Sequence, residues 1–431
     1  MISTKTSRLH RLLSVLLVSF PTVLLMLPAG RRFNFYALLL CAVGGLALGV
    51  KPGGKSFRDI IKKYWSLHLA MAGMLIAVLL NQAAHGAFAF KPFEKGLQLA
   101  VFPLLLWVFL ILSSDKLRIL QWSWVIGALL CSIALIWTTY GVTDRPGGII
   151  TNPFILFSNL TLLMGCMALL SIGWNTRDEI APIAIKVVAC ALSLVASYMS
   201  GTRGSWIAVP VFILIAVSLK QSMHDRRKIV ISIVSMLLLA VAMASLPYTK
   251  TRIELAYSEA AHYAEQPKAE TSIGIRLQLW QASWNMFREN PVFGVGTAHY
   301  EETLRRLARD KVITPQAGSQ LHSHNEFLHF MATLGTPGAL AMLALYLVPG
   351  LWFKKFLRSA DSQQRIAAGM GLATSLAFLA FGLTETMFYS NLCSDFYIIS
   401  VAALSALIIN RQDELEKTAK SSLSSELIHE K

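Results

Sequence analysis

Repeated apolar runs, most of them long enough to cross the hydrocarbon core of a lipid bilayer and several of them short or interrupted by Pro, constrain the fold of this chain more than any other feature. A helix of about 20 residues spans that core, which is about 30 Å thick. We identify twelve such segments, at residues 12–28, 33–50, 64–80, 96–112, 119–140, 153–173, 181–200, 205–219, 229–246, 327–351, 366–384 and 395–410. The sequence therefore predicts an all-α, polytopic membrane protein with about twelve transmembrane helices.

The composition supports this prediction. Of the 431 residues, 55% are hydrophobic and 15% are charged, whereas soluble domains contain about 25% charged residues. The net charge of +15 could indicate a nucleic-acid partner. Because Lys and Arg in cytoplasmic loops orient membrane proteins, we interpret the charge in that way and expect membrane lipids, not nucleic acid, as partners. The five cysteines show no metal-like or paired spacing, and we interpret them as small apolar residues.

The distribution of basic residues predicts the orientation in the membrane. If the N-terminus is cytoplasmic, the cytoplasmic segments carry 23 Lys and Arg and the short outer loops carry 6, which favours an even number of spans. The first apolar run follows basic residues but lacks a convincing cleavage pattern, so we expect an uncleaved first helix. The predicted organisation is helices one to nine in 1–246, a periplasmic loop at 247–326, three more helices in 327–410, and a polar, disordered cytoplasmic tail at 411–431.

One amphipathic helix is predicted near 272–289 in the long loop. Thr271 or Ser272 can cap its N-terminus, and Pro291 ends it ahead of a glycine-containing turn. Four apolar side chains recur at helical spacing, namely Ile273, Leu277, Trp280 and Trp284. This stripe predicts contact with the membrane surface or with the helix bundle.

Two arginines are candidate ligands for an anionic substrate. Arg203 lies between Gly201 and Gly204 at the outer end of an apolar run. A snorkelling, orienting arginine is one interpretation, but positive charge is disfavoured on this side, and the glycines leave backbone amides open to an anion. Arg276 lies in the first turn of the loop helix, where a cation opposes the helix dipole unless an anion binds. A solvated charge is the alternative interpretation of Arg276.

The densest cluster of titratable groups lies where the long loop meets the next apolar segment. It contains His322 and His324, followed by Asn325 and Glu326. A histidine here can act as a base near neutral pH, with Asn325 and Glu326 orienting it, or it can simply cap the helix. Two imidazoles two residues apart could share a metal ion. No acidic or cysteine residue completes such a set convincingly, so we predict no metal.

These motifs resemble those of the bacterial O-antigen ligases, members of the O-antigen ligase and polymerase superfamily of membrane proteins. The resemblance rests on His324-Asn325, nine further residues, Gly335, two residues and Gly338. The sequences Thr202-Arg203-Gly204, at the end of an apolar run, and Gly274-Ile275-Arg276-Leu277, at the start of the loop helix, precede this motif in the same order. A twelve-span layout with a large periplasmic loop before the last three spans is also similar to the ligases.

The resemblance implies a C-type glycosyltransferase-like fold and a metal-independent glycosyltransferase at the periplasmic face of the bacterial inner membrane. The donor would be an O-antigen glycan on undecaprenyl diphosphate and the acceptor lipid A–core, with no cofactor. His324, Arg276 and Arg203 match the catalytic residues of the family. Both arginines would also bind substrate, together with His322 and Asn325. Such arginines could neutralise a leaving diphosphate while His324 accepts the proton of the acceptor hydroxyl.

Three alternative functions remain open from the sequence. An O-antigen polymerase would use the same donor with a lipid-linked acceptor, and a protein O-oligosaccharyltransferase would use a protein acceptor. A transporter could also have twelve spans. We disfavour the transporter because the sequence shows no internal repeat and no acidic residue in the middle of a span.

Overall fold

The protein folds as a bundle of long apolar helices in a computed structural model that describes residues 2–27, 32–140, 153–174, 179–219, 254, 258 and 270–429. Eight described helical segments are long and apolar enough to cross a membrane, one of which, Phe90–Leu110, consists of two consecutive helices, and three apolar segments are shorter. The apolar helices are α1 (Ile2–Met26), α2 (Phe33–Ala47), α4 (Trp65–His85), α5 (Phe90–Ala100), α6 (Phe102–Leu110), α8 (Leu120–Thr139), α9 (Phe154–Leu170), α10 (Ile180–Met199), α11 (Val209–Leu219), α17 (Glu326–Lys354), α18 (Ser362–Gly382) and α19 (Asn391–His429). The predicted all-α, polytopic membrane fold is confirmed. The predicted segment 229–246 lies outside the described residues.

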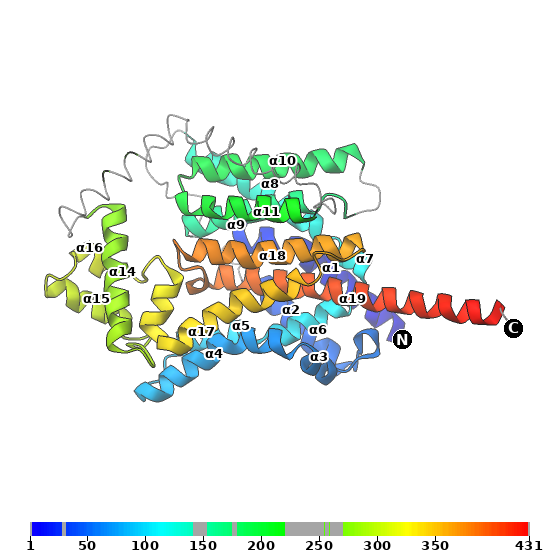
Figure 1. Ribbon diagram of the computed structural model, residues 1–431, viewed down its shortest axis with the longest axis horizontal. Helices are drawn as coiled ribbons and strands as arrows, with labels where there is room; N and C mark the ends of the chain where they lie inside the picture. Colours follow the sequence, from blue (N-terminus) through cyan, green and yellow to red (C-terminus); the bar gives the residue numbers. More distant parts are fainter. Residues whose placement is uncertain are drawn as a thin grey trace.

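Shorter helices connect these spans or belong to the long loop. They are η1 (Pro52–Gly54), α3 (Phe57–Lys63), α7 (Ser114–Leu117), η2 (Arg203–Ala208), α14 (Ser272–Glu289), α15 (Tyr300–Arg309), α16 (Pro315–Gly318) and η3 (Met387–Tyr389). Figure 1 shows α14, α15 and α16 together beyond one end of the bundle, while the end of α19 projects from the opposite end. The long loop therefore forms a helical cap over one end of the membrane helices.

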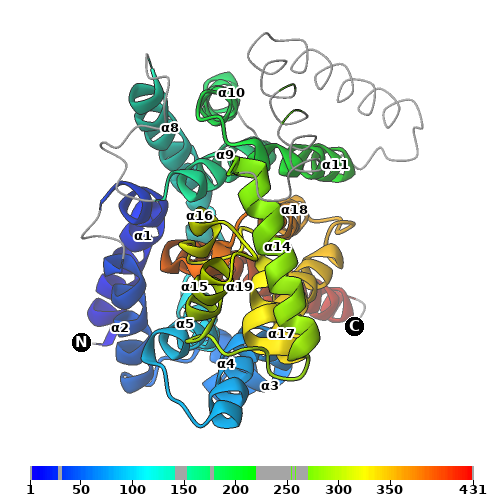
Figure 2. The same ribbon diagram turned by 90° about the vertical axis from the view of Figure 1, so that its left-hand side faces the viewer.

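Helix α19 lies at the centre of the bundle. Its residues from Phe396 to Ile409 are buried on every side, and a helix that is apolar all round is stable only inside such a core. Figures 1 and 2 place α18 and α19 between a layer containing α8 to α11 and a layer containing α4 to α6 and α17. The loops at the capped ends of α18 and α19 are consequently held in the middle of the molecule.

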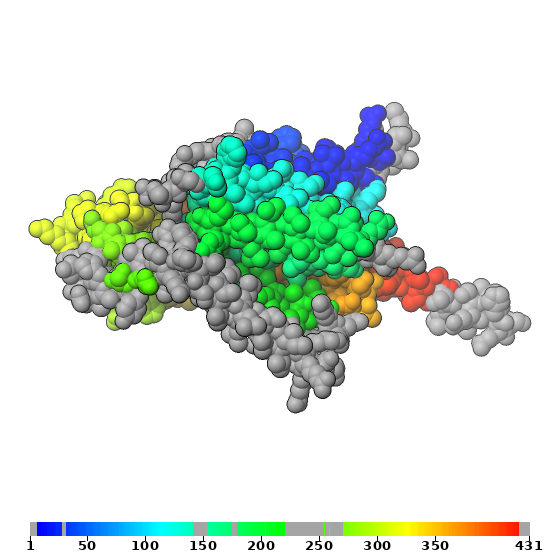
Figure 3. All heavy atoms as spheres, turned by 90° about the horizontal axis from the view of Figure 1, so that it is seen from above, coloured from blue at the N-terminus to red at the C-terminus, as the bar shows by residue number. Residues whose placement is uncertain are grey.

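The outer face of the bundle is apolar, as expected for helices that contact lipid. Seen from above, α8 and α10 cover much of one face (Figure 3). The exposed side chains of α10 include Val187, Val188 and Val195, each close to half exposed. The five cysteines are free and buried, which agrees with their interpretation as small apolar residues.

The predicted disordered tail is instead helical, because α19 continues without a break to His429. The residues after Arg411 are mostly good helix formers such as Gln, Glu, Lys and Ala. Arg411 forms an ion pair with Asp361 at 2.9 Å, and Lys55 pairs with Asp413. These contacts anchor the first turns beyond the apolar part of the helix.

Helix α5 begins earlier than the predicted segment 96–112. It starts at Phe90, and α6 follows after a break at Val101, because Pro103 provides no N–H for a continuous helix. The charged residues of 91–95 lie between the predicted segments 64–80 and 96–112, where a loop was expected. In the structure they form the first turns of a helix, which places Lys91 and Lys95 at the capped end of the bundle.

The turn after α14 is locked onto a kink in α17. Gly335 has φ +67° and ψ −151°, which interrupts the helix and frees backbone groups on both sides. Val295 N–H donates to the carbonyl of Ala332 at 2.8 Å, and Gly296 N–H donates to that of Thr333 at 3.1 Å. Thr336 N–H donates to the carbonyl of Pro291 at 2.9 Å. The loop and the membrane helix thus provide hydrogen-bond partners for each other's backbone N–H and C=O groups, which need such partners when they are buried.

Glycine is required where the two backbones meet. A Cβ on Gly335 would lie 2.4 Å from the carbonyl oxygen of Val292, and one on Gly294 would lie 2.6 Å from that of Ala332. Both glycines also have positive φ angles, which cost other residues about 1–3 kcal/mol. Close packing of two backbones therefore explains the glycine after the histidine motif.

Helix α14 packs through a different face from the one predicted. Thr271 caps it by accepting a hydrogen bond from Gly274 N–H at 3.0 Å. The face that packs against α17 and α15 contains Ile275, Leu279, Ala282 and Met286. The predicted stripe is not this face: its residues are partly exposed, and Trp284 is 45% exposed. Of its two predicted contacts, the one with the membrane surface stays a prediction. Small residues on the packing face, such as Gly274 and Ala282, permit the closer approach.

We predict that Gly335→Ala lowers the melting temperature of the detergent-purified protein by several degrees, because the new Cβ collides with the backbone of the docked turn. Gly350→Ala in the same helix is the matched control. Its Cβ would meet only side chains at 3.6 Å, and alanine favours the helix by about 1 kcal/mol. Equal melting temperatures for the two variants would contradict the backbone lock.

Candidate active site

The histidine motif forms a tight turn just before α17. His324 has φ +52°, a left-handed conformation that is uncommon for residues other than glycine and recurs at functional sites. Asn325 caps α17 by accepting a hydrogen bond from Leu328 N–H at 3.0 Å. Its side-chain amide donates to the carbonyl of Leu383 at 3.1 Å. The cap therefore fixes the turn on α17 and also ties it to the loop after α18.

That second loop brings a buried carboxylate to the histidines. Nδ1 of His324 lies 3.1 Å from Oε2 of Glu385, and Nδ1 of His322 lies 3.6 Å from Oε1. Thr386 N–H also donates to Glu385, at 3.0 Å, and only 4% of this residue is exposed. Burial opposes ionisation, but the hydrogen bond and positive charge of His324 outweigh it and lower the pKa of Glu385 to about 2. Glu385 is therefore a carboxylate at neutral pH.

Glu326 does not take the orienting position that the sequence analysis assigned to it. It is fully buried at the start of α17, where it accepts hydrogen bonds from the hydroxyl of Tyr346 and the N–H of Phe388. Phe388 belongs to η3, which follows Glu385 closely in the chain. Glu326 thus supports the loop, and Glu385 is the residue that contacts His324. Sequence reasoning missed Glu385 because 61 residues separate it from His324.

His322 and Arg276 are electrostatically coupled. The ring of His322 packs against those of His324 and Tyr389, with centroids 4.5 Å and 5.2 Å away. Burial and the charges of His324, Lys95 and Arg276 together lower the pKa of His322 to about 4, against the opposing effect of Glu385. His322 is therefore neutral at physiological pH. Arg276, half-buried in the first turn of α14, acts on the same site.

Arg203 begins η2, whose backbone lies against the loop that carries Glu385. A Cβ on Gly204 would lie 2.2 Å from the hydroxyl oxygen of Thr384. Ser205 donates a hydrogen bond to the side chain of Asn159 at 2.6 Å, which fixes η2 on α9. The side chain of Arg203 lies outside the described part of the structure. Its catalytic role therefore stays a prediction. The residue that follows it, Gly204, lies against Thr384, which precedes Glu385.

The site contains a set of atoms that could hold a divalent cation. One ligand atom each from His322, His324 and Glu385 lies within 4.8 Å of the others. The argument that no acidic residue completes the histidine pair is therefore wrong, because packing of α18 against α17 supplies one from far along the chain. The His324–Glu385 distance of 3.1 Å also suits a direct hydrogen bond. The arrangement can thus share a proton or bind a cation, and activity in the presence of a chelator separates the two.

Comparison with known proteins finds similarity in one part of this chain. Residues 188–343 match the family model described as O-antigen ligase, a range that includes η2, α14, α15 and the histidine motif. An uncharacterised protein of Haemophilus influenzae is 24% identical over 212 residues, which cover 49% of this chain and 53% of that relative. The chain thus matches about half the length of this curated relative. The region 188–343, less than half of the chain, is therefore similar to the O-antigen ligase family.

Proposed function

We propose that this protein is an O-antigen ligase that transfers a glycan from undecaprenyl diphosphate to lipid A–core at the periplasmic face of the bacterial inner membrane. The family domain supports a transferase of this class, and the membrane helices support lipid-linked substrates. One observation carries the proposal: His324, at the start of a membrane helix, contacts the buried carboxylate of Glu385 and lies next to His322, on which the charge of Arg276 acts.

His324 acts as the general base in this proposal. Its Nδ1 donates a hydrogen bond to Glu385, which leaves Nε2 to accept the proton of the acceptor hydroxyl. The carboxylate then stabilises the imidazolium that forms, as in other base–carboxylate pairs. The fixed turn around His324 holds the ring in one orientation, so little reorganisation is needed when the proton moves.

The arginines stabilise the leaving group. As the acceptor oxygen forms its bond to the anomeric carbon, the bond between that carbon and the diphosphate oxygen breaks, and its electron pair stays on the diphosphate. Arg276 and Arg203 bind the oxygens that gain charge. His322, kept neutral by burial, adds a hydrogen bond to the substrate without a further charge. Asn325 contributes by holding the turn, since its amide already bonds Leu328 and Leu383.

A strain that lacks this protein should make lipid A–core without O-antigen, while long glycan chains accumulate on undecaprenyl diphosphate. A ligase joins finished chains to the core, so its loss leaves the core unmodified. Gel analysis of lipopolysaccharide and extracted lipid-linked glycans measures both products. Core that carries single repeats would instead indicate a polymerase, and unchanged lipopolysaccharide would point to a protein acceptor or another function.

In a reconstituted assay with both lipid substrates, Arg276→Ala should reduce transfer about 10²-fold or more, because a preorganised group that stabilises developing charge is lost. Arg276→Lys should restore little of the rate, since a lysine lacks the bidentate fork. Arg288→Ala, at the exposed end of the same helix, is the control and should match the wild type.

The Arg276 assay should be repeated with a chelator present. We expect wild-type transfer to continue, because the proposed mechanism uses protein cations for the leaving group. Loss of activity that a divalent ion restores would instead indicate a metal held by His322, His324 and Glu385. Full activity of Arg276→Ala would remove this arginine from the mechanism.

A further inference from the structure

A cavity lined by two lysines lies next to the proposed catalytic groups. It has a volume of about 290 Å³ and is enclosed by α4, α5, the first turns of α17, the segment leading into α15, and η3. Tyr389 forms the shared wall: its ring contacts that of His322 on one side, with centroids 5.2 Å apart. Nζ of Lys95 lies 3.7 Å from the centre of the same ring. The cavity volume is close to the lower end of the range for small-ligand pockets, about 300–1,000 Å³.

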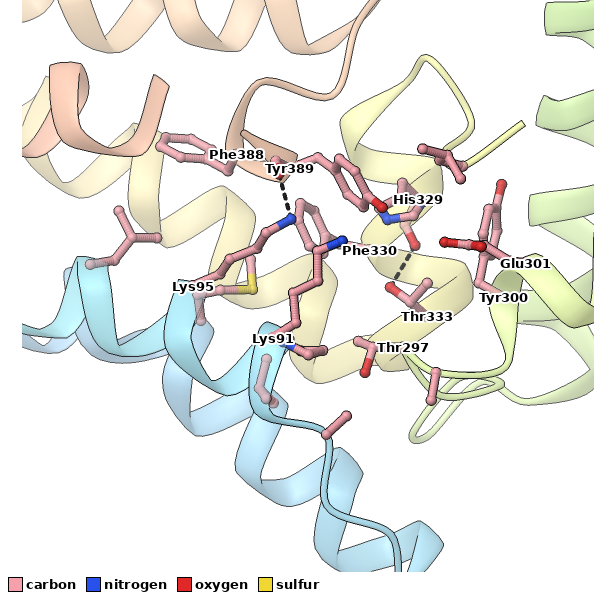
Figure 4. Close-up of a pocket in the computed structure, with 17 residues that line it drawn as sticks. Lys91, Lys95, Thr297, Tyr300, Glu301, His329, Phe330, Thr333, Phe388 and Tyr389 are labelled. Atoms are coloured by element: carbon pink, nitrogen blue, oxygen red, sulfur yellow. Dashed lines mark hydrogen bonds between the residues drawn. The ribbon is translucent and has the colours of Figure 1, made fainter. Parts of the chain in front are cut away.

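Two lysines give this cavity an excess of positive charge. Figure 4 shows Lys91 and Lys95 extending from α5 toward the ring of Tyr389 and that of Phe330. Like charges one helical turn apart repel each other, and Lys91 lies in the first turn of α5, where the helix dipole disfavours a cation. Among the described residues neither lysine forms an ion pair, while Nζ of Lys95 donates a hydrogen bond to the carbonyl of Tyr389. An anion in the cavity would reverse both costs.

The rest of the lining suits a sugar phosphate better than a simple anion. The acidic residue of the cavity, Glu301, forms an ion pair with Arg305 at 3.1 Å, so two lysines line the cavity with one carboxylate that already has a partner. Tyr300 and Tyr389 supply aromatic faces, and Tyr389 and Thr297 supply hydroxyl groups (Figure 4), whereas the hydroxyl of Tyr300 is hydrogen-bonded to Ser283. Aromatic faces with a few placed polar groups are typical of sites that orient a polar organic ligand.

The charge of Lys95 also reaches the catalytic groups. It acts on His322 from α5, while Arg276 acts on the same histidine from α14. Two separate cationic elements therefore flank the groups that would carry out the transfer. A reaction between two lipid-linked glycans needs two binding sites, and in the proposed function Arg276 holds the diphosphate of the donor.

We propose that Lys91 and Lys95 form an anion subsite that binds a phosphate group on the acceptor glycolipid and so presents its hydroxyl to His324. This inference rests on the proposed function for the identity of the two substrates. The same chemistry could bind inorganic phosphate or the diphosphate of the donor, and the experiment below separates these sources.

The test uses the full-length protein in liposomes, with separate titrations of donor and acceptor. Lys91→Gln and Lys95→Gln should each raise the KM for the acceptor about tenfold, equivalent to about 1.4 kcal/mol, because one charge-assisted contact is lost. The KM for the donor should stay unchanged. Lys354→Gln, an exposed lysine at the far end of α17, is the control. Acceptor that has been treated with a phosphatase should bind wild type and variants equally.

Several results would overturn this inference while leaving the ligase proposal intact. An acceptor KM equal to that of the wild type in both lysine variants would do so, and so would a rise in the donor KM alone. The same rise in KM with phosphatase-treated acceptor as with untreated acceptor would also do so. Competition by millimolar inorganic phosphate that is equal in wild type and variants would also count against the subsite.

A binding measurement keeps the test independent of turnover. The phosphorylated acceptor glycolipid should raise the melting temperature of the wild type, but not that of the Lys91→Gln, Lys95→Gln double variant. An undiminished shift in the double variant contradicts the subsite even if the wild type transfers no glycan. Failure of the ligase proposal alone would appear as absent transfer with this binding difference preserved.

Discussion

The backbone contact between the turn after α14 and the kink in α17 is the constraint on which the rest of the site depends. At Gly335 the membrane helix exposes carbonyl groups that the loop residues Val295 and Gly296 satisfy. The same contact fixes the end of α14, whose first turn carries Arg276, relative to the first turn of α17, which follows His324. Because neither backbone tolerates a Cβ there, the periplasmic loop proposed from the sequence can dock in only one register.

The electrostatics of the site follow from burial combined with a small number of charged partners. Glu385 is kept ionised by His324 although it is almost completely buried, whereas His322 is kept neutral by burial and nearby cations. One histidine can thus exchange a proton against a fixed carboxylate, and the other adds no charge. Environments that shift the pKa values of neighbouring titratable groups in opposite directions are characteristic of sites that carry out acid–base chemistry.

The sequence predicted the features that depend on local pattern. Apolar runs reveal membrane helices because a chain in lipid must satisfy its backbone hydrogen bonds internally, which few structures other than a helix can do. The cap at Thr271 follows from its position before a helix. Glu385 could not be predicted, since its contact with His324 depends on how two loops meet. Lys91 and Lys95 were assigned to a loop because charges at the end of a span resemble a boundary. The packing face of α14 depends on small residues that allow close approach, which a stripe of large apolar residues such as Trp284 does not indicate.

The central claim is that His324 works as a base oriented by Glu385, and a double-mutant cycle on kcat tests it most directly. In the reconstituted transfer assay, His324→Ala should reduce kcat about 10²- to 10⁴-fold. Glu385→Gln should reduce kcat substantially with little change in either KM, and the double variant should be no slower than His324→Ala alone. Wild-type kcat in Glu385→Gln, or losses that simply multiply in the double variant, would contradict the account.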